Sequence, residues 1–179
     1  MQIRLTIPEE LDEIARLYRT NHRETYRGLL SEQYFSRLTP DHAREKWEKF
    51  LEEPGNRLWT ACGEGTLLGF AAGREDPELP DTWYLDALHV AKAARGRGVG
   101  SALLRACGAY ALSSGHRKMS VCIVKGNERA RGLYEALGAE HVLDFDDDFC
   151  GTVSHSEKWL WKDLRVFQPA AGGKDAALP

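Results

Sequence analysis

The stretch 85–104 constrains the fold more than any other part of this 179-residue chain. Residues 85–90 are mostly apolar and follow a polar, proline-containing run, which predicts a buried strand. A short turn then leads to three glycines at alternate positions, Gly96, Gly98 and Gly100, and after Gly98 apolar residues recur with helical spacing. The chain is therefore expected to pass from strand to helix through a segment with few side chains.

A helix that begins in such a segment presents unsatisfied backbone N–H groups at the positive end of its dipole, and this combination binds phosphate. Arg95 and Arg97 add positive charge beside the glycines. Two common phosphate loops do not fit. A dinucleotide fingerprint needs two residues between its second and third glycines, and the Gly-Lys-Ser/Thr triplet of a P-loop is absent. We therefore predict a phosphate site of another kind.

The composition predicts one domain in an aqueous compartment. The chain is 42% apolar, which suffices for a sizeable core, and its net charge of −3 gives no general attraction to nucleic acid or to anionic membranes. No run approaches the ~20 apolar residues of a membrane helix, and the first residues lack a signal-peptide pattern. We expect a cytoplasmic protein that binds neither nucleic acid nor membrane, with a domain over 1–165 and a flexible tail over 166–179.

Cysteine and histidine positions do not predict a metal site. The four cysteines form no Cys-x-x-Cys pair, and the six histidines have no ligand spacing with one another or with cysteine. Cys62 and Cys122 lie in expected strands and Cys107 on the apolar face of an expected helix, so we expect reduced, buried thiols. Cys150 falls near the last expected strands.

Apolar periodicity and turn residues predict a mixed α/β fold. Strands are expected over 2–7, 57–63, 66–74, 85–90, 118–124, 141–145 and 153–164. Helices are expected after Pro8, within 21–38 with a break at Gly28, after Thr39-Pro40, from 99 to about 115, and after Asn127. This order implies mixed strand pairing and helices on both faces of one sheet.

Two segments resemble motifs of one family. Arg-x-x-Gly-x-Gly at 95–100 is similar to the pyrophosphate loop of the GNAT superfamily of acyl-coenzyme-A-dependent N-acyltransferases. The segment 127–139, NERARGLYEALGA, resembles the superfamily's N-x-x-A-x-x-x-Y-x-x-x-G-A pattern at every named position. The element order also resembles that of the GNAT fold, over about residues 1–165. The resemblance implies a mostly antiparallel central sheet of about seven strands with helices on both faces.

The resemblance also implies an activity: transfer of an acetyl group from the cosubstrate acetyl-CoA to a primary amine of a small molecule or peptide. Backbone groups of the central strand would align the pantetheine arm, the glycine loop would hold the pyrophosphate, and Tyr134 would protonate the leaving thiolate. From the residues alone, Tyr134 could instead be a core side chain and Asn127 a helix cap. The implied cofactor-binding residues are Leu88, His89, Val90, Arg95, Gly96, Arg97, Gly98, Val99, Gly100, Ser101, Asn127 and Tyr134.

The base that accepts the amine proton is marked less clearly. The bacterial GNAT subgroup that this chain resembles commonly carries Glu at the position of Tyr84. Asp86 is our candidate base, and we expect its side chain on the face of Tyr84, with His89 on the opposite face because strand side chains alternate. Glu24 and Tyr26 are alternatives, since they lie in a stretch expected to line the acceptor pocket.

The acceptor and the assembly also rest on alternatives. Acidic clusters at 75–81 and 144–148 would favour a cationic acceptor, such as a polyamine, an aminoglycoside or a peptide amine, if they flank the pocket mouth; otherwise they are solvated loop charges. Trp159 and Trp161 share one face of the last strand and would lie in the core or in a homodimer contact. The competing function is a non-catalytic acyl-CoA-binding or sensor module.

Overall fold

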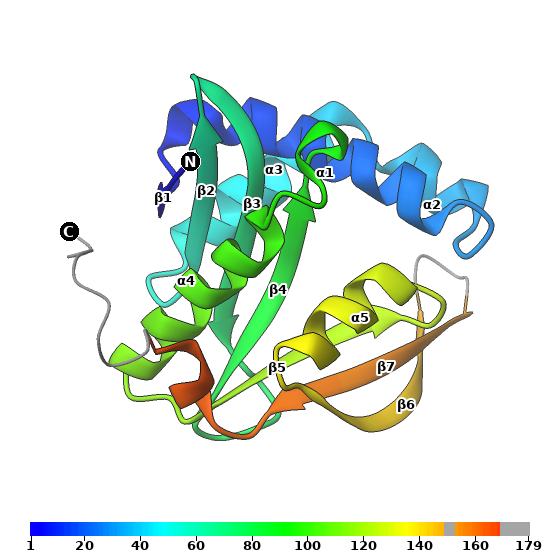
Figure 1. The fold of residues 1–179 in the computed structure, drawn as a ribbon. Helices are drawn as coiled ribbons and strands as arrows, with labels where there is room; N and C mark the ends of the chain where they lie inside the picture. The colour runs from blue at the N-terminus through cyan, green and yellow to red at the C-terminus, as the bar shows by residue number, and fades with distance from the viewer. Residues whose placement is uncertain (149–152, 169–179) are drawn as a thin grey trace.

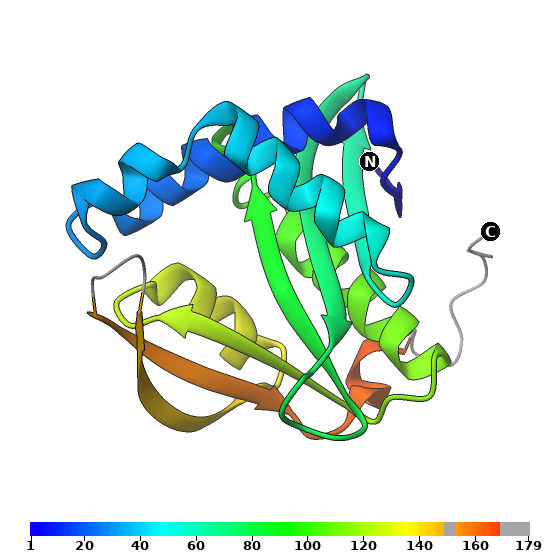
Figure 2. The ribbon, with the colours of Figure 1, turned by 180° about the vertical axis from the view of Figure 1, so that it is seen from behind.

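The computed structural model describes residues 1–148 and 153–168, which form a seven-stranded sheet with helices on both faces (Figures 1 and 2). The strand order is β1-β2-β3-β4-β5-β7-β6, and every pairing is antiparallel except that of β4 with β5. The predicted GNAT-like architecture is therefore confirmed. The strands are β1 (Gln2–Leu5), β2 (Arg57–Gly63), β3 (Thr66–Glu75), β4 (Thr82–Val90), β5 (Lys118–Val124), β6 (Glu140–Asp148) and β7 (Val153–Trp161).

The helices divide the core into two clusters. Side chains of α1 and α3 pack with one face of β2, β3 and β4, whereas those of α4 and α5 belong to the second cluster, on the opposite face of the sheet. Local chemistry sets the helix starts: the Thr39 and Ser31 hydroxyls accept hydrogen bonds from backbone N–H groups of the first helical turn. The helices are α1 (Leu11–Tyr26), α2 (Glu32–Arg37), α3 (Pro40–Glu52), α4 (Val99–Ser113) and α5 (Glu128–Ala136), with short 3₁₀ turns η1 (Pro8–Glu10), η2 (Lys92–Ala94) and η3 (Leu164–Phe167).

Two features near the C-terminus differ from expectation. The last strand ends at Trp161, and η3 follows, with Phe167 buried against Gly108 of α4, where a Cβ atom would lie 2.2 Å from the Phe167 ring. The packed chain therefore reaches beyond residue 165, and the remainder of the expected tail, 169–179, lies outside the described residues, as does Cys150. The acidic residues 146–148 extend β6 and are not in a loop.

β4 and β5 separate midway along their length. Their parallel pairing covers Thr82–Leu85 with Lys118–Val121, and beyond it β4 pairs only with β3 and β5 only with β7. The described chain thus forms two lobes that diverge from this point, one carrying α1 to α4 and the other α5, β6 and β7 (Figure 1). The free edge of β4 faces the opening between them.

A bulge in β4 changes which side chains share a face. Ala72 of β3 pairs with Ala87 and Gly73 pairs with Leu85, so Asp86 is an extra residue in β4. Because the bulge interrupts the alternation, Asp86 and His89 both face α1 and α3: Asp86 approaches Lys46 of α3, and His89 packs on Tyr18 of α1. The prediction that these two side chains lie on opposite faces is wrong.

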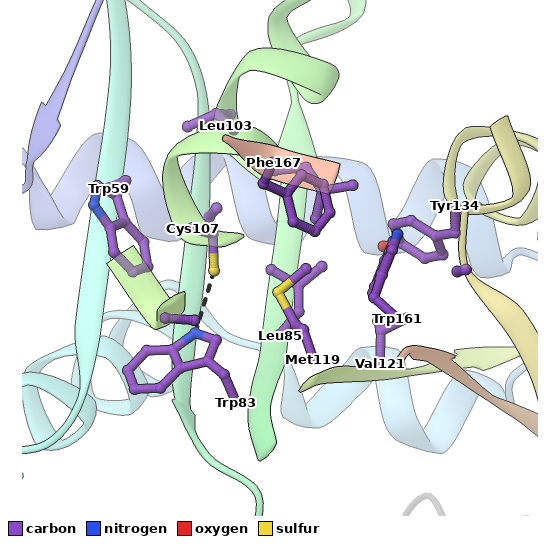
Figure 3. Close-up of a cluster of buried hydrophobic side chains, with 14 of the residues drawn as sticks. Trp59, Trp83, Leu85, Leu103, Cys107, Met119, Val121, Tyr134, Trp161 and Phe167 are labelled. Atoms are coloured by element: carbon purple, nitrogen blue, oxygen red, sulfur yellow. Dashed lines mark hydrogen bonds between the residues drawn. The ribbon is translucent and has the colours of Figure 1, made fainter. Parts of the chain in front are cut away.

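The tryptophans of β7 belong to the core. Trp159 and Trp161 are 4% and 1% exposed, and Trp161 packs edge-on against Tyr134 with ring centroids 5.4 Å apart (Figure 3). The same cluster holds Trp83, whose indole N–H donates to the Cys107 sulfur at 3.2 Å. The alternative in which Trp159 and Trp161 form a dimer contact is wrong, because both are covered within one chain. A homodimer through another surface stays a prediction.

Candidate functional site

A cavity of about 750 Å³ lies where the two lobes diverge. Its walls come from the end of α1, the free edge of β4, the loop before α4 and the start of α5. The cavity brings together the glycine-rich segment and the second motif, which are about 30 residues apart in sequence. The predicted cofactor-binding residues that line it are Leu88, His89, Val90, Arg95, Gly96, Gly98, Val99, Gly100, Ser101, Asn127 and Tyr134, and Arg97 is the one predicted cofactor-binding residue absent from this lining.

The glycine loop has the conformation that its sequence requires. Gly96 and Gly98 have φ angles of 76° and 78°, in the left-handed region that side chains disfavour, and a Cβ atom at either position would find nothing within 4 Å. α4 begins at Val99, so the first N–H groups of this 15-residue helix have no partner within it. Open space beside free amides at a helix N-terminus suits a phosphate group.

Arg95 lies beside this loop and holds α1 against it. Its guanidinium donates to the Val90 carbonyl at 3.2 Å and to the Asn21 side-chain oxygen at 2.9 Å, and it forms an ion pair with Glu24 at 3.0 Å. The Asn21 amide also donates to the Val90 carbonyl, at 3.0 Å. Sequence reasoning missed Asn21, because nothing in α1 signals that it reaches the end of β4.

The free edge of β4 offers a limited set of backbone groups. The Ala91 N–H donates to the Leu68 carbonyl of β3, whereas the Val90 carbonyl accepts from the Asn21 amide on the cavity side. The backbone groups of successive residues along this segment therefore point to opposite edges of β4. The backbone groups of Leu88 and the N–H of Val90 therefore face the cavity, whereas those of His89 face β3. His89 lines the cavity with its side chain.

Tyr134 and Asn127 lie together at the start of α5. The Asn127 side chain accepts from the Ala130 N–H at 3.3 Å, which confirms the capping role. Tyr134 is buried against Trp161 and also lines the cavity, so packing and contact with a ligand are compatible at this position. Burial raises the pKa of Tyr134 well above its ordinary value, which keeps the phenol protonated. Burial likewise raises the pKa of Tyr26, against a hydrogen bond to Asn127 that lowers it.

A second cavity, of about 240 Å³, adjoins the first on the side of α1 and α3. The two cavities share lining residues, among them Leu88, His89 and Tyr134, so they meet beside the free edge of β4. The second cavity is rich in aromatic and polar side chains. Those that line this second cavity alone include Tyr18, His22, Lys46, Tyr84, Asp86, Cys122 and Asp147.

Two histidines of the second cavity are held neutral. Burial lowers the pKa of His89 to about 3 and lowers that of His22 well below its ordinary value, and the positive charge of Lys46 acts in the same direction on both. The Tyr34 hydroxyl lies 2.7 Å from the His22 Nδ1 atom. Neither His22 nor Lys46 follows from a sequence motif, because α1 and α3 supply them from positions that look like ordinary helix residues.

Asp86 has two cationic partners. Its Oδ1 atom accepts from the Arg74 Nε at 3.1 Å, and its Oδ2 atom lies 3.6 Å from the Lys46 Nζ. The carboxylate is 14% exposed and lines the second cavity. Glu24, an alternative base, lines the first cavity instead and is paired with Arg95, so the structure separates the three candidates: Asp86 in the second cavity, Glu24 beside the glycine loop, and Tyr26 where the cavities meet.

Most of the acidic residues that suggested a cationic acceptor are paired elsewhere. Asp76 is buried, accepts from the Ser120 hydroxyl and lies 3.6 Å from the Lys158 ammonium, so it supports the structure of the loop before β4. Asp144 is paired with Lys125 on the surface. Asp147 of β6 is the one member of these clusters in the second cavity's lining.

Residues 1–148 and 153–168 hold neither a metal-binding cluster nor a membrane-spanning helix. No three His, Cys, Asp or Glu side chains in this part of the chain come close enough to hold a metal ion. None of its helices combines the length and apolar character needed to cross a bilayer.

Comparison with known proteins identifies the family. The model described as "Acetyltransferase (GNAT) family" matches residues 15–139. An uncharacterised N-acetyltransferase of Bacillus subtilis is 31% identical over 64% of this chain and 69% of its own length, and the 5-NmdU N-acetyltransferase of Pseudomonas phage PaMx11 is 31% identical over 64% and 80%. The chain spans only 39% of a third relative, the bovine thialysine N-epsilon-acetyltransferase, which is 31% identical over 37% of this chain.

Solved structures agree on the fold. The ribosomal-protein-alanine N-acetyltransferase of Brucella melitensis superposes with a TM-score of 0.74 over 90% of this chain and 99% of its own, at 20% identity. The spermidine N-acetyltransferase of Vibrio cholerae, in complex with CoA and spermine, has a TM-score of 0.71 over 93% and 98%, at 16% identity. The family model covers most of the chain, and the predicted motifs meet at one cavity. The chain therefore belongs to the GNAT acetyltransferase family.

Proposed function

We propose that this protein is an N-acetyltransferase that transfers the acetyl group of acetyl-CoA to a primary amine. One observation carries the proposal: a single cavity joins a helix N-terminus with open left-handed glycines, a free strand edge and a buried, protonated tyrosine. These features fit the three parts of the cosubstrate, namely the pyrophosphate, the amide-containing arm and the thioester. The named functions of the relatives and structural neighbours include several kinds of acceptor, so they support the reaction class rather than one amine.

The chain would bind and orient the cosubstrate through backbone groups. The amides of Val99, Gly100 and Ser101, together with the open loop at Gly96 and Gly98, would hold the pyrophosphate. The backbone groups of Leu88 and the N–H of Val90 would pair with the arm as an added strand, and one of these N–H groups would polarise the thioester carbonyl. When bound, acetyl-CoA supplies an acetyl group already activated as a thioester.

Two side chains of this protein would move the protons. Asp86 would accept, directly or through a water molecule, the proton that the amine nitrogen loses as its bond to the carbonyl carbon forms. Tyr134 would donate the proton that the sulfur takes as the carbon–sulfur bond breaks. Asp86 and Tyr134 both line the second cavity, where the acceptor would enter, so both lie on the side of the reacting amine.

The competing function, a module that binds acyl-CoA without catalysis, accounts for the first cavity but not for the second. The second cavity meets the first beside Leu88 and Tyr134 and is lined by polar side chains that cofactor binding alone would not require. This observation favours a two-substrate enzyme.

The test is release of free thiol from acetyl-CoA in the presence of amines. We expect turnover with at least one amine class, and a fall of ~10²-fold or more in kcat for Tyr134→Phe, with acetyl-CoA binding retained. Tyr110→Phe is the matched control, because Tyr110 packs on Trp59 and Trp83 and lines neither cavity. Acetyl-CoA binding without thiol release from any amine would favour the binding module, and a full rate for Tyr134→Phe would remove Tyr134 from the mechanism.

A further inference from the structure

The second cavity, taken as the acceptor site of the proposed function, has a volume of about 240 Å³ and is smaller than the first cavity, at about 750 Å³. The two cavities meet beside Leu88 and Tyr134, so an acceptor amine in the second cavity would lie next to the free edge of β4.

One wall of this cavity carries a lysine that shares its carboxylate partner. Lys46 lines the cavity and approaches Asp86, and Arg74, which lies outside the lining, approaches the same carboxylate. Asp86 is hydrogen-bonded to Arg74, whereas its distance to the Lys46 ammonium is 3.6 Å. Within residues 1–148 and 153–168 the Lys46 ammonium donates no hydrogen bond to a protein atom, and its side chain is 36% exposed. Its three N–H groups are available to a ligand.

Lys46 is nevertheless held in place. Its ammonium lies 5.3 Å from the ring centroid of Tyr18 and 4.8 Å from that of Trp47, which is fully buried. These aromatic contacts and Asp86 fix a positive charge at the cavity wall, beside two neutral histidines. An anionic group of a ligand would be attracted to the Lys46 ammonium at this point.

The other lobe contributes the opposite charge. Asp147 of β6 lines the same cavity, whereas Lys46 belongs to α3 in the first lobe (Figure 2). The cavity therefore presents a cation from one lobe and a carboxylate from the other. A small acceptor that carries both an anionic and an amino group matches this arrangement better than a simple amine.

We propose that the acceptor is an α-amino acid, whose carboxylate binds Lys46 and whose amino group lies toward Asp86 and the free edge of β4 at Leu88. One carbon atom separates the two functional groups of an α-amino acid, and the Lys46 and Asp86 side chains are correspondingly close. A carboxylate is favoured over a phosphate because Lys46 supplies the one ammonium among the described residues that line this cavity. A phosphate would carry more charge and would need further donors.

The experiment compares four matched series of acceptors that differ only at the position of the carboxylate. They are L-amino acids, their primary carboxamides, the corresponding amines that lack a carboxylate, and aminoalkyl phosphates. Thiol release from acetyl-CoA is measured for the native protein and for Lys46→Met, Lys46→Arg and Lys49→Met. Lys49 is the control, since it lies one turn further along α3, is exposed and pairs with Glu45.

We expect kcat/KM to be at least tenfold higher for amino acids than for their uncharged analogues. Lys46→Met should raise KM for amino acids by ~10- to 100-fold, as expected for loss of a charge-assisted hydrogen bond, without raising KM for the uncharged analogues. Because Lys46 also lies 3.6 Å from Asp86, any change in kcat should be common to both series. Lys46→Arg should keep most of the preference, and Lys49→Met should behave as the native protein. This split in KM distinguishes ligand binding from a general loss of folding.

Other results would overturn the inference in distinguishable ways. Equal or better turnover of the uncharged analogues, or of the aminoalkyl phosphates, would overturn the carboxylate assignment and leave the transferase function standing. A Lys46→Met variant whose KM changes equally for charged and uncharged acceptors would do the same. Binding of acetyl-CoA without thiol release from any member of the four series would overturn the proposed function and this inference together.

Discussion

Adding one methyl group at Gly98 or at Gly132 should change stability in opposite directions. Gly98 has a φ angle of 78° immediately before α4, and Gly132 lies in the interior of α5 on its exposed side. A Cβ atom at either position would meet nothing within 4 Å, so neither substitution creates a clash. Any difference between Gly98→Ala and Gly132→Ala must therefore come from the backbone conformation.

The expected magnitudes follow from that conformation. A non-glycine residue in the left-handed region costs about 1–2 kcal/mol, so Gly98→Ala should lower the free energy of unfolding by that amount. Alanine replaces glycine inside a helix with a gain of about 0.5–1 kcal/mol, so Gly132→Ala should raise it. The two variants, identical in composition, should differ by about 1.5–3 kcal/mol, or roughly 3–12 °C in Tm for a domain of this size.

Urea unfolding with and without acetyl-CoA measures both consequences. Gly98→Ala should also reduce the stabilisation that acetyl-CoA provides, because relief of the strain re-aims the amides of the loop, whereas Gly132→Ala should keep it. Equal or greater stability for Gly98→Ala than for the native protein would refute the conformational argument. Undiminished stabilisation by acetyl-CoA in Gly98→Ala would refute the assignment of the loop to the pyrophosphate.

Three further predictions concern the β4 region. Asp86→Asn should lower kcat/KM by ~10²-fold or more while acetyl-CoA binding is retained, and an unchanged kcat/KM would exclude Asp86 as the base. Because burial lowers the pKa of His89 to about 3, below ~6.5 in the unfolded chain, the unfolded state binds more protons between these values. The free energy of unfolding of the native protein should therefore fall as the pH drops below 6.5, by up to ~1.4 kcal/mol per pH unit. This fall should be less steep in His89→Phe. Urea unfolding midpoints of the two proteins from pH 5 to 7.5 measure the difference. Gly73→Ala should destabilise by ~3 kcal/mol or more, since its Cβ would lie 2.1 Å from the Trp83 indole nitrogen, and a midpoint within error of the native one would contradict that packing.

The local parts of the fold and site could be predicted from sequence. The glycine loop, the caps at Thr39 and Asn127 and the strands 57–63 and 118–124 depend on neighbouring residues, and the structure confirms each of them. The cytoplasmic location, the lack of a nucleic-acid partner and the homodimer stay predictions, because the fold of one chain does not decide them.

The parts that depend on distant contacts could not be predicted. Asn21 looks like any polar helix residue until α1 is placed against the end of β4, and Lys46 becomes a binding candidate only because Arg74 shares Asp86 with it. The change in which β4 side chains share a face also depends on a distant contact. The extra residue, Asp86, is recognised only from the pairing of β4 with β3. The pattern of apolar residues predicts which side of a helix or strand is buried. These features depend instead on which residues, distant in the sequence, pack against that helix or strand.

Because Asp86 is an extra residue, the number of residues in β4 determines which face each later side chain lies on, more than the identity of those residues does. Before it, Leu85 faces α4 and Tyr84 the opposite side; after it, Leu88 faces α4 and His89 the opposite side. Side chains on the proposed acceptor side can therefore be exchanged while the backbone edge proposed to pair with the cosubstrate stays in place. Removal of a single residue here would instead turn every later side chain over and direct the free N–H groups toward β3. Redesign of acceptor choice should thus succeed by substitution and fail by deletion.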